Sequence, residues 1–105
     1  MTEAEAVAIV HEALVGPDNL PLKLVRRQGF DEAQFQRVKS ALASLVAAYQ
    51  DRDSVPKALA YALVDVQATF QMGLAAYPTD VQQRIVDASE ELVDLAYLLF
   101  RYPEA

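Results

Sequence analysis

The sequence predicts an all-α fold, an antiparallel helical bundle of three long helices plus one or two shorter N-terminal helices. Three segments carry apolar residues at alternating steps of three and four, the spacing that places side chains on one side of an α-helix. Each such side needs a partner that excludes water, so the segments are expected to pack together in a four-helix-bundle-like domain spanning residues 1–105. The repeating positions are Phe35, Val38, Leu42, Leu45 and Tyr49; Leu59, Leu63, Val66, Phe70, then Gly73 or Leu74, and Tyr77; and Val81, Ile85, Ala88, Leu92, Leu95, Leu99 and Tyr102.

The composition indicates a single globular domain. The chain has 105 residues, of which 53% are hydrophobic and 23% charged, and this balance excludes a fully disordered protein. The longest uninterrupted apolar run, residues 58–64, is far shorter than the roughly 20 residues that cross a bilayer, so no membrane partner is expected. The first five residues lack the basic start and apolar stretch of a signal peptide. With the absence of cysteine, this favours a cytoplasmic location.

The first helix is expected at about residues 3–15. Thr2 and Glu5 have the spacing of a capping box, in which each side chain accepts a hydrogen bond from a backbone amide of the first turn. Gly16 and Pro17 end the helix, because glycine favours the position after a helix and proline cannot continue one.

A second, short helix is expected at about residues 20–28. Asp18 or Asn19 would cap its start, and Arg26 and Arg27 would occupy its last turn, where positive charge is favoured. Gly29 is the natural residue after its end. An extended conformation is the alternative for this segment, although the chain offers no strand to pair with it.

Three long helices are expected at about residues 32–50, 55–76 and 80–102. The first has the strongest start signal: Asp31 and Gln34 match a helix cap, and Phe30 has the spacing to pack on Phe35 as a hydrophobic staple. Pro56 suits the first turn of the second helix, and Pro78 follows its end. Thr79 and Gln82 match another capping box, and Pro103 stops the last helix.

The helix at 55–76 is unusually apolar on the side opposite its main apolar stripe. Ala58, Tyr61 and Met72 lie on that side, so the helix is expected to be covered on two sides, either by the N-terminal helix or by another subunit. The second alternative predicts a homodimer. Gly73, which weakens a helix relative to alanine, indicates the close approach of a crossing helix.

No catalytic, cofactor-binding or metal-binding residues are predicted. His11 is the only histidine, and neither a carboxylate pattern nor further histidines accompany it to form a base or a metal site. The three glycines stand apart, so no phosphate-binding loop is present. We therefore expect a protein that is not an enzyme and carries no cofactor.

The charge of the chain disfavours nucleic-acid partners. Its formal net charge is −6, and a negative protein repels phosphate backbones. Residues 78–105 contain six acidic residues against two basic ones. A basic protein is therefore the better expected partner.

The helix at 80–102 presents the most functional-looking surface of the sequence. An acidic strip opposite its apolar stripe runs into an aromatic and apolar end, and aromatic anchors beside steering charges are typical of docking surfaces. The predicted partner-binding residues are Asp87, Glu90, Glu91, Asp94, Tyr97 and Leu98.

These observations predict a noncatalytic, acidic helical protein that acts by protein–protein contact. It would be a homo-oligomer, or an inhibitor, immunity-type or chaperone-like adaptor for a basic partner. The alternative is a helical bundle that binds a small apolar ligand between its helices, with Tyr61, Phe70, Met72 and Tyr97 as lining.

Overall fold

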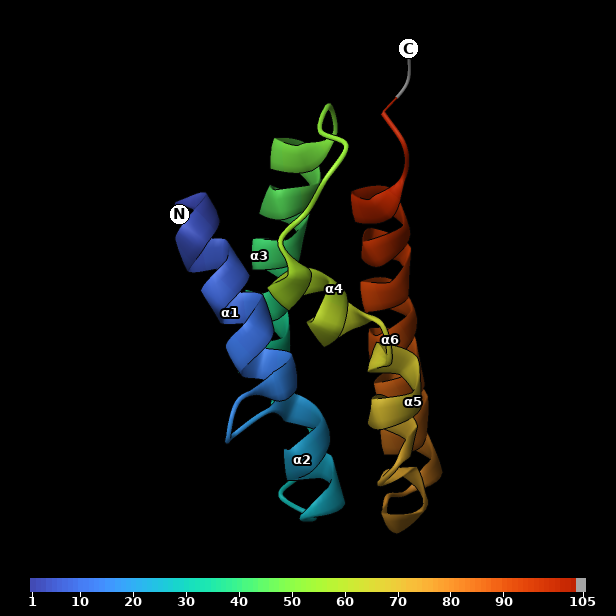
Figure 1. The fold of residues 1–105 in the computed structure, drawn as a ribbon. Helices are drawn as coiled ribbons and strands as arrows, with labels where there is room; N and C mark the ends of the chain where they lie inside the picture. Colours follow the sequence, from blue (N-terminus) through green and yellow to red (C-terminus); the bar gives the residue numbers. More distant parts are fainter. Residues whose placement is uncertain (104–105) are drawn as a thin grey trace.

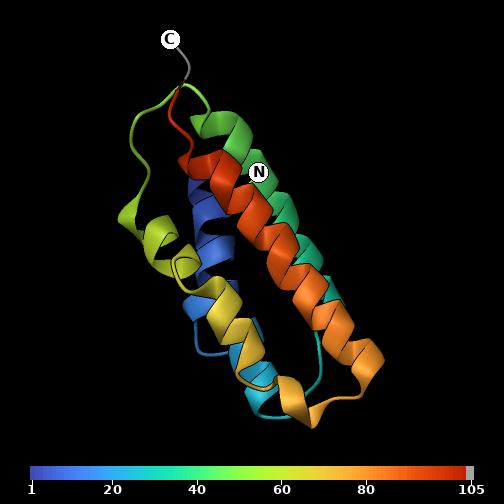
Figure 2. The same ribbon diagram turned by 90° about the vertical axis from the view of Figure 1, so that its right-hand side faces the viewer.

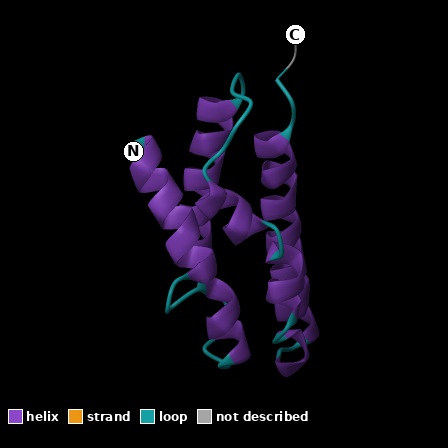
Figure 3. Ribbon diagram, viewed as in Figure 1, coloured by secondary structure: helices purple, strands orange, loops and turns teal. Residues whose placement is uncertain are grey.

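The computed structural model describes residues 1–103, which form helices joined by short loops without a β-strand (Figures 1 and 3). This confirms the all-α prediction and is consistent with bundle-like packing. The α-helices are α1 (Glu3–Val15), α2 (Leu20–Val25), α3 (Glu32–Tyr49), α4 (Lys57–Leu63), α5 (Val66–Gln71) and α6 (Thr79–Phe100), and a 3₁₀ helix, η1 (Leu74–Ala76), precedes α6. None of these helices has the length and apolar character needed to cross a membrane.

The helices form four sides of an elongated bundle, 46 Å along its longest axis. Along the chain, α1 with α2, α3, α4 with α5, and α6 run in alternating directions (Figures 1 and 2). Around the bundle, α1 packs on α3, α3 on α6, α5 on α6, and α4 on α1. The N-terminal segment is therefore one full side of the bundle and not a cover over a three-helix core.

Two neighbouring sides, α3 and α6, run parallel. The α3 residue Glu32 pairs with Arg84 of α6, and Lys39 of α3 pairs with Glu91 of α6. Each partner lies seven residues further along its own helix, which requires the two helices to point the same way. The antiparallel arrangement predicted for sequential segments therefore holds along the chain, but not for this pair.

The single long helix predicted at 55–76 is wrong, because this segment is divided into α4, α5 and η1. The first break follows α4, where Asp65 has φ −122° and ψ 15° and no side-chain cap. Leu59 of α4 and Phe70 of α5 are both fully buried, while α4 packs on α1 and α5 packs on α6. The change in direction lets the two short helices reach different partners (Figure 1).

The predicted starts of α1 and α3 are confirmed. In α1 the Glu5 amide donates to the Thr2 hydroxyl oxygen at 3.1 Å, and the Thr2 amide donates to the Glu5 carboxylate at 3.3 Å. In α3 the Gln34 amide donates to the Asp31 carboxylate at 3.0 Å. The rings of Phe30 and Phe35 lie 5.5 Å apart, as expected of a hydrophobic staple.

The segment predicted as a helix at 20–28 is shorter than expected. Asn19 caps α2 by accepting a hydrogen bond from the Leu22 amide at 2.8 Å, so the extended alternative is wrong for residues 20–25. The helix ends at Val25, and Arg27 and Gly29 then adopt φ values of 60° and 89°. Arg26 and Arg27 therefore follow the helix and do not occupy its last turn.

The capping box predicted at Thr79 and Gln82 is also wrong. Helix α6 begins at Thr79 itself, with Pro78 as a cap that offers no side-chain acceptor. The Gln82 side-chain amide instead donates to the Tyr77 carbonyl at 2.8 Å, which ties the first turn of α6 to the preceding loop.

The apolar stripes predicted from the 3–4 spacing form one core. Most of their members are buried, and the large side chains with no measurable exposure include Val10, Leu20, Leu24, Phe35, Val38, Leu42, Leu45, Leu59, Phe70, Ile85 and Leu92. Tyr102 departs from the pattern, because it lies beyond the end of α6 and is 85% exposed.

Candidate interaction surface

The six predicted docking residues all lie on α6, the long helix at the right of Figure 1, but they do not form one surface. Residues three or four apart share a side of a helix. Asp87, Glu90, Asp94 and Tyr97 therefore follow one line, and Glu91 and Leu98, seven residues apart, follow a neighbouring line. The two lines have different environments.

Glu91 belongs to the contact between α3 and α6. Its carboxylate accepts hydrogen bonds from Lys39 at 2.9 Å and from Arg84 at 3.3 Å. The Lys39 ammonium, followed by the Arg84 guanidinium, lowers the pKa of Glu91 below its ordinary value. A carboxylate held in this way stabilises the bundle and is not free for a partner.

Arg84 is the centre of this contact. Its guanidinium also binds Glu32 at the first turn of α3 through its Nε and Nη2 groups. It lies over the rings of Phe30 and Phe35, with 5.4 Å and 5.0 Å from its central carbon to the ring centroids. The hydrogen bonds that Glu32 accepts from Arg84 lower the pKa of its carboxyl group below the ordinary value. Arg84 therefore joins the start of α3 to α6.

Asp87, Glu90 and Asp94 form an acidic ridge on the solvent side of α6. All three side chains are exposed. Asp87 accepts a hydrogen bond from the Gln83 amide at 2.9 Å. Within residues 1–103, no cationic group lies within 4.0 Å of any of the three carboxylates. The acidic ridge therefore keeps its charge unpaired.

Tyr97 lies where the acidic ridge meets an apolar groove between α6 and the α4–α5 segment. The groove has a volume of about 520 Å³ and is lined on its α6 side by Val93, Ala96, Tyr97 and Phe100. Val64 contributes to the opposite wall and is 80% exposed, and Tyr97 is 75% exposed. We call this the α6 groove.

Leu98 is separated from Tyr97 by the geometry of the helix. Consecutive helical residues point about 100° apart, and Leu98 does not line the α6 groove. It is less exposed than Tyr97, at 42%. Of the two apolar residues in the predicted set, Tyr97 therefore lines the α6 groove, with Phe100 and Val64 as its apolar neighbours.

Val64 and Phe100 line the α6 groove but are not among the predicted partner-binding residues. Val64 ends the apolar run at 58–64, which the sequence presents as helix interior, and it becomes exposed because the chain turns after α4. Phe100 belongs to the apolar run at residues 95–100, at the end of α6. One side of a helix cannot bury six consecutive apolar residues, so some of them stay exposed.

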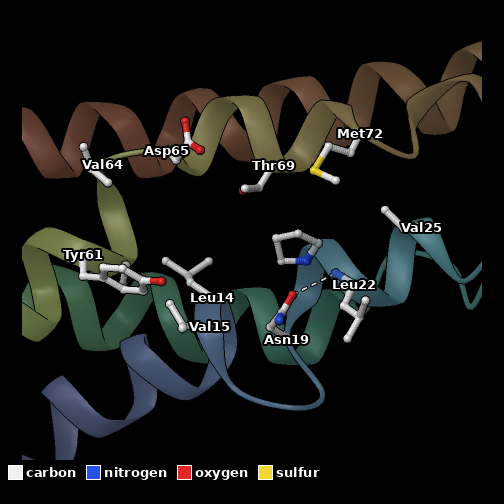
Figure 4. A pocket seen from close by; sticks show the side chains of 12 residues that line it. Leu14, Val15, Asn19, Leu22, Val25, Tyr61, Val64, Asp65, Thr69 and Met72 are labelled. Carbon is white, nitrogen blue, oxygen red and sulfur yellow. Dashed lines mark hydrogen bonds between the residues drawn. The ribbon is translucent and has the colours of Figure 1, made fainter.

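A second apolar groove lies on the other side of Val64, between the α1–α2 segment and the α4–α5 segment (Figure 4). Its volume is about 420 Å³. Tyr61 and Met72 line it and are 69% and 71% exposed. We call this the α2 groove.

The residues predicted to line a ligand site are not brought together. Tyr61 and Met72 line the α2 groove, Tyr97 lines the α6 groove, and Phe70 is fully buried in the core. Phe70 therefore serves packing, and any ligand site in the α2 groove has a different composition from the one expected.

His11 is partly buried on α1 and makes no side-chain hydrogen bond with the described residues. Among residues 1–103, no three His, Cys, Asp or Glu side chains are placed to hold a metal ion together.

Comparison with known proteins does not assign a function: no family model, curated protein or solved structure matches this chain.

Proposed function

We propose that the protein acts without catalysis, by binding a basic protein partner on α6. The observation that carries this proposal is the position of Tyr97, a 75% exposed aromatic side chain between the unpaired acidic ridge and the apolar α6 groove. An inhibitor, an immunity-type protein and a chaperone-like adaptor would all use a surface of this kind.

The acidic ridge supports a partner that carries Lys or Arg. Carboxylates at Asp87, Glu90 and Asp94 follow one another at helical spacing, and like charges three or four residues apart destabilise a helix by a few tenths of a kcal/mol per pair. A cationic partner relieves this repulsion. Complementary charges also steer the encounter of two proteins, so the ridge mainly raises the association rate.

The α6 groove supports an apolar anchor beside those charges. Tyr97 offers a rigid ring with a large contact area, and Phe100 and Val64 extend the apolar surface around it. Central aromatic residues contribute most of the binding energy in many interfaces. An amphipathic helix with Lys or Arg beside its apolar side fits this combination.

The proposal includes the absence of a nucleic-acid partner and a cytoplasmic location. The net charge of −6 disfavours contact with phosphate backbones. The absence of cysteine agrees with a reducing compartment.

A photo-crosslinking amino acid in place of Tyr97, used in living host cells, tests the site directly. We expect a discrete covalent adduct with another protein. The matched control carries the same amino acid in place of Gln36, an exposed position on α3, and should give no such adduct. Equal adducts at both positions, or none at residue 97, would contradict a partner site on α6.

Self-association is a second candidate, favoured by the exposure around the turn between α4 and α5. Helix α1 packs on α4 but leaves Tyr61, Val64 and Met72 at least 69% exposed. Large apolar side chains gathered on one side of a small protein are typical of an interaction site. A second copy of the chain would cover this side in a homodimer.

A further inference from the structure

The α2 groove has the size and walls of a small-molecule site, although it is open to solvent. Its volume of about 420 Å³ falls within the roughly 300–1,000 Å³ typical of such sites. Leu14, Val15 and Leu22 line the side formed by α1 and α2, and Tyr61 and Met72 line the other side. Figure 4 shows Tyr61 reaching toward Leu14 and Val15, with Met72 and Val25 near the other end.

Two polar side chains in the α2 groove are already occupied. The Asn19 side chain accepts from the Leu22 amide at 2.8 Å, the bond drawn in Figure 4, and donates to the Gly16 carbonyl at 2.8 Å. The Thr69 hydroxyl donates to the Val66 carbonyl at 3.0 Å. Both groups therefore serve the backbone of their own segments.

Among residues 1–103, Asp65 is the only charged residue that lines the α2 groove. Its carboxylate has no cationic group within 4.0 Å among residues 1–103. Asp65 lies at the turn between α4 and α5, exposed at the rim of the groove, and in Figure 4 its carboxylate points outward and not between the two walls. The groove thus combines apolar walls with one uncompensated negative charge.

We propose that the α2 groove binds a small molecule that has an apolar body and a single ammonium group. The walls remove the apolar body from water, which is the main source of affinity in such sites. The carboxylate of Asp65 attracts the ammonium group and repels an anionic ligand. The ring of Tyr61, four residues earlier on α4, offers an aromatic surface that also favours a cation.

Three probes of the same shape and different charge test this proposal: 4-phenylbutylamine, 4-phenylbutanol and 4-phenylbutyrate. Each is titrated into the full-length protein and followed by the NMR chemical shifts of its backbone amides. We expect the amine to bind most tightly and the carboxylate most weakly. The shifted amides should belong to the residues that line both walls of the α2 groove.

Variants separate the role of Asp65 from the general attraction of an acidic protein for cations. Asp65→Asn should weaken binding of the amine about fivefold, the range expected for one exposed charge pair, and leave binding of the alcohol unchanged. Asp53→Asn removes the same charge at an exposed position in the loop after α3 and should change neither. Equal binding of amine and carboxylate, no binding of the amine, or equal effects of both substitutions would overturn the proposal. None of these results bears on the protein partner proposed for α6.

Discussion

Gly73 packs directly against the backbone of Leu24. A Cβ atom on Gly73 would lie 2.9 Å from both the carbonyl carbon and the carbonyl oxygen of Leu24, and 2.9 Å from the amide nitrogen of Val25. The Tyr77 hydroxyl strengthens the same junction by donating to the Leu24 carbonyl at 2.8 Å. The close approach predicted for Gly73 is therefore confirmed, and its partner is the end of α2.

Gly73→Ala should destabilise the protein, although Gly73 has a φ of −101° and alanine at such a position stabilises a protein by about 0.4–1 kcal/mol where space allows. The added methyl group meets backbone that cannot rotate away, and overpacking of this kind costs about 1–3 kcal/mol. Urea unfolding followed by circular dichroism measures the change. Gln71→Ala, at an exposed position nearby, should change stability by less than about 0.5 kcal/mol. A Gly73→Ala variant as stable as the parent would show that α2 does not lie against residue 73.

The contact between α3 and α6 should make stability depend on pH. The folded-state pKa values of Glu32 and Glu91 lie below the ordinary value of 4.5, Glu32 through Arg84 and Glu91 through Lys39 and then Arg84. Groups with a lowered pKa stabilise the fold above that ordinary value. Their contribution is lost as pH falls through the folded-state pKa. The free energy of unfolding should therefore decrease as the pH is lowered below about 5.

Arg84→Met should reduce both the stability at pH 7 and its decrease toward acid pH. Because these ion pairs are partly exposed, the expected loss at pH 7 is about 1 kcal/mol. Urea unfolding at a series of pH values between 7 and 3 measures both effects. Arg37→Met, which removes an exposed guanidinium without an ion pair in residues 1–103, is the control. An Arg84→Met variant with the parent's pH profile would mean that the ion pairs do not form in solution.

Self-association should depend on Val64. At micromolar concentration we expect a dimer mass by light scattering, and Val64→Glu should return a monomer, because a charge would be buried in the interface. The side chain is 80% exposed in the single chain, so the thermal midpoint of the monomer should barely change. Ala47→Glu adds the same charge at an exposed position on α3 and should leave the dimer intact. A monomer mass for the parent protein would rule out the second candidate function.

Features that depend on neighbouring residues could be predicted from the sequence. The cap at Asp31 and the packing of Phe30 on Phe35 involve residues no more than five positions apart. The buried positions of α3 and α6 follow from the helical repeat alone. Local spacing is sufficient for such features, because their partners lie in the same segment.

The division of the segment at 55–76 depends on contacts that local spacing does not contain. Neither glycine nor proline marks Val64 and Asp65, and the apolar repeat continues through them. The break follows from the need of α4 to pack on α1 while α5 packs on α6. The pairing of Glu91 with Lys39, 52 residues away, could not be predicted from local spacing for the same reason. The sequence therefore predicted the acidic strip of α6 but not which of its acids remain unpaired.

The central proposal is tested most directly by the binding kinetics of the protein that crosslinks through residue 97. The key variant carries Asp87→Lys, Glu90→Lys and Asp94→Lys, and its control carries Asp18→Lys, Asp51→Lys and Asp53→Lys at exposed positions outside α6. We expect the α6 variant to associate more slowly and to lose the salt dependence seen at low ionic strength. The control should behave like the parent, and Tyr97→Ala should instead dissociate faster. An α6 variant that binds with the parent's rates and salt dependence would contradict docking on the acidic ridge.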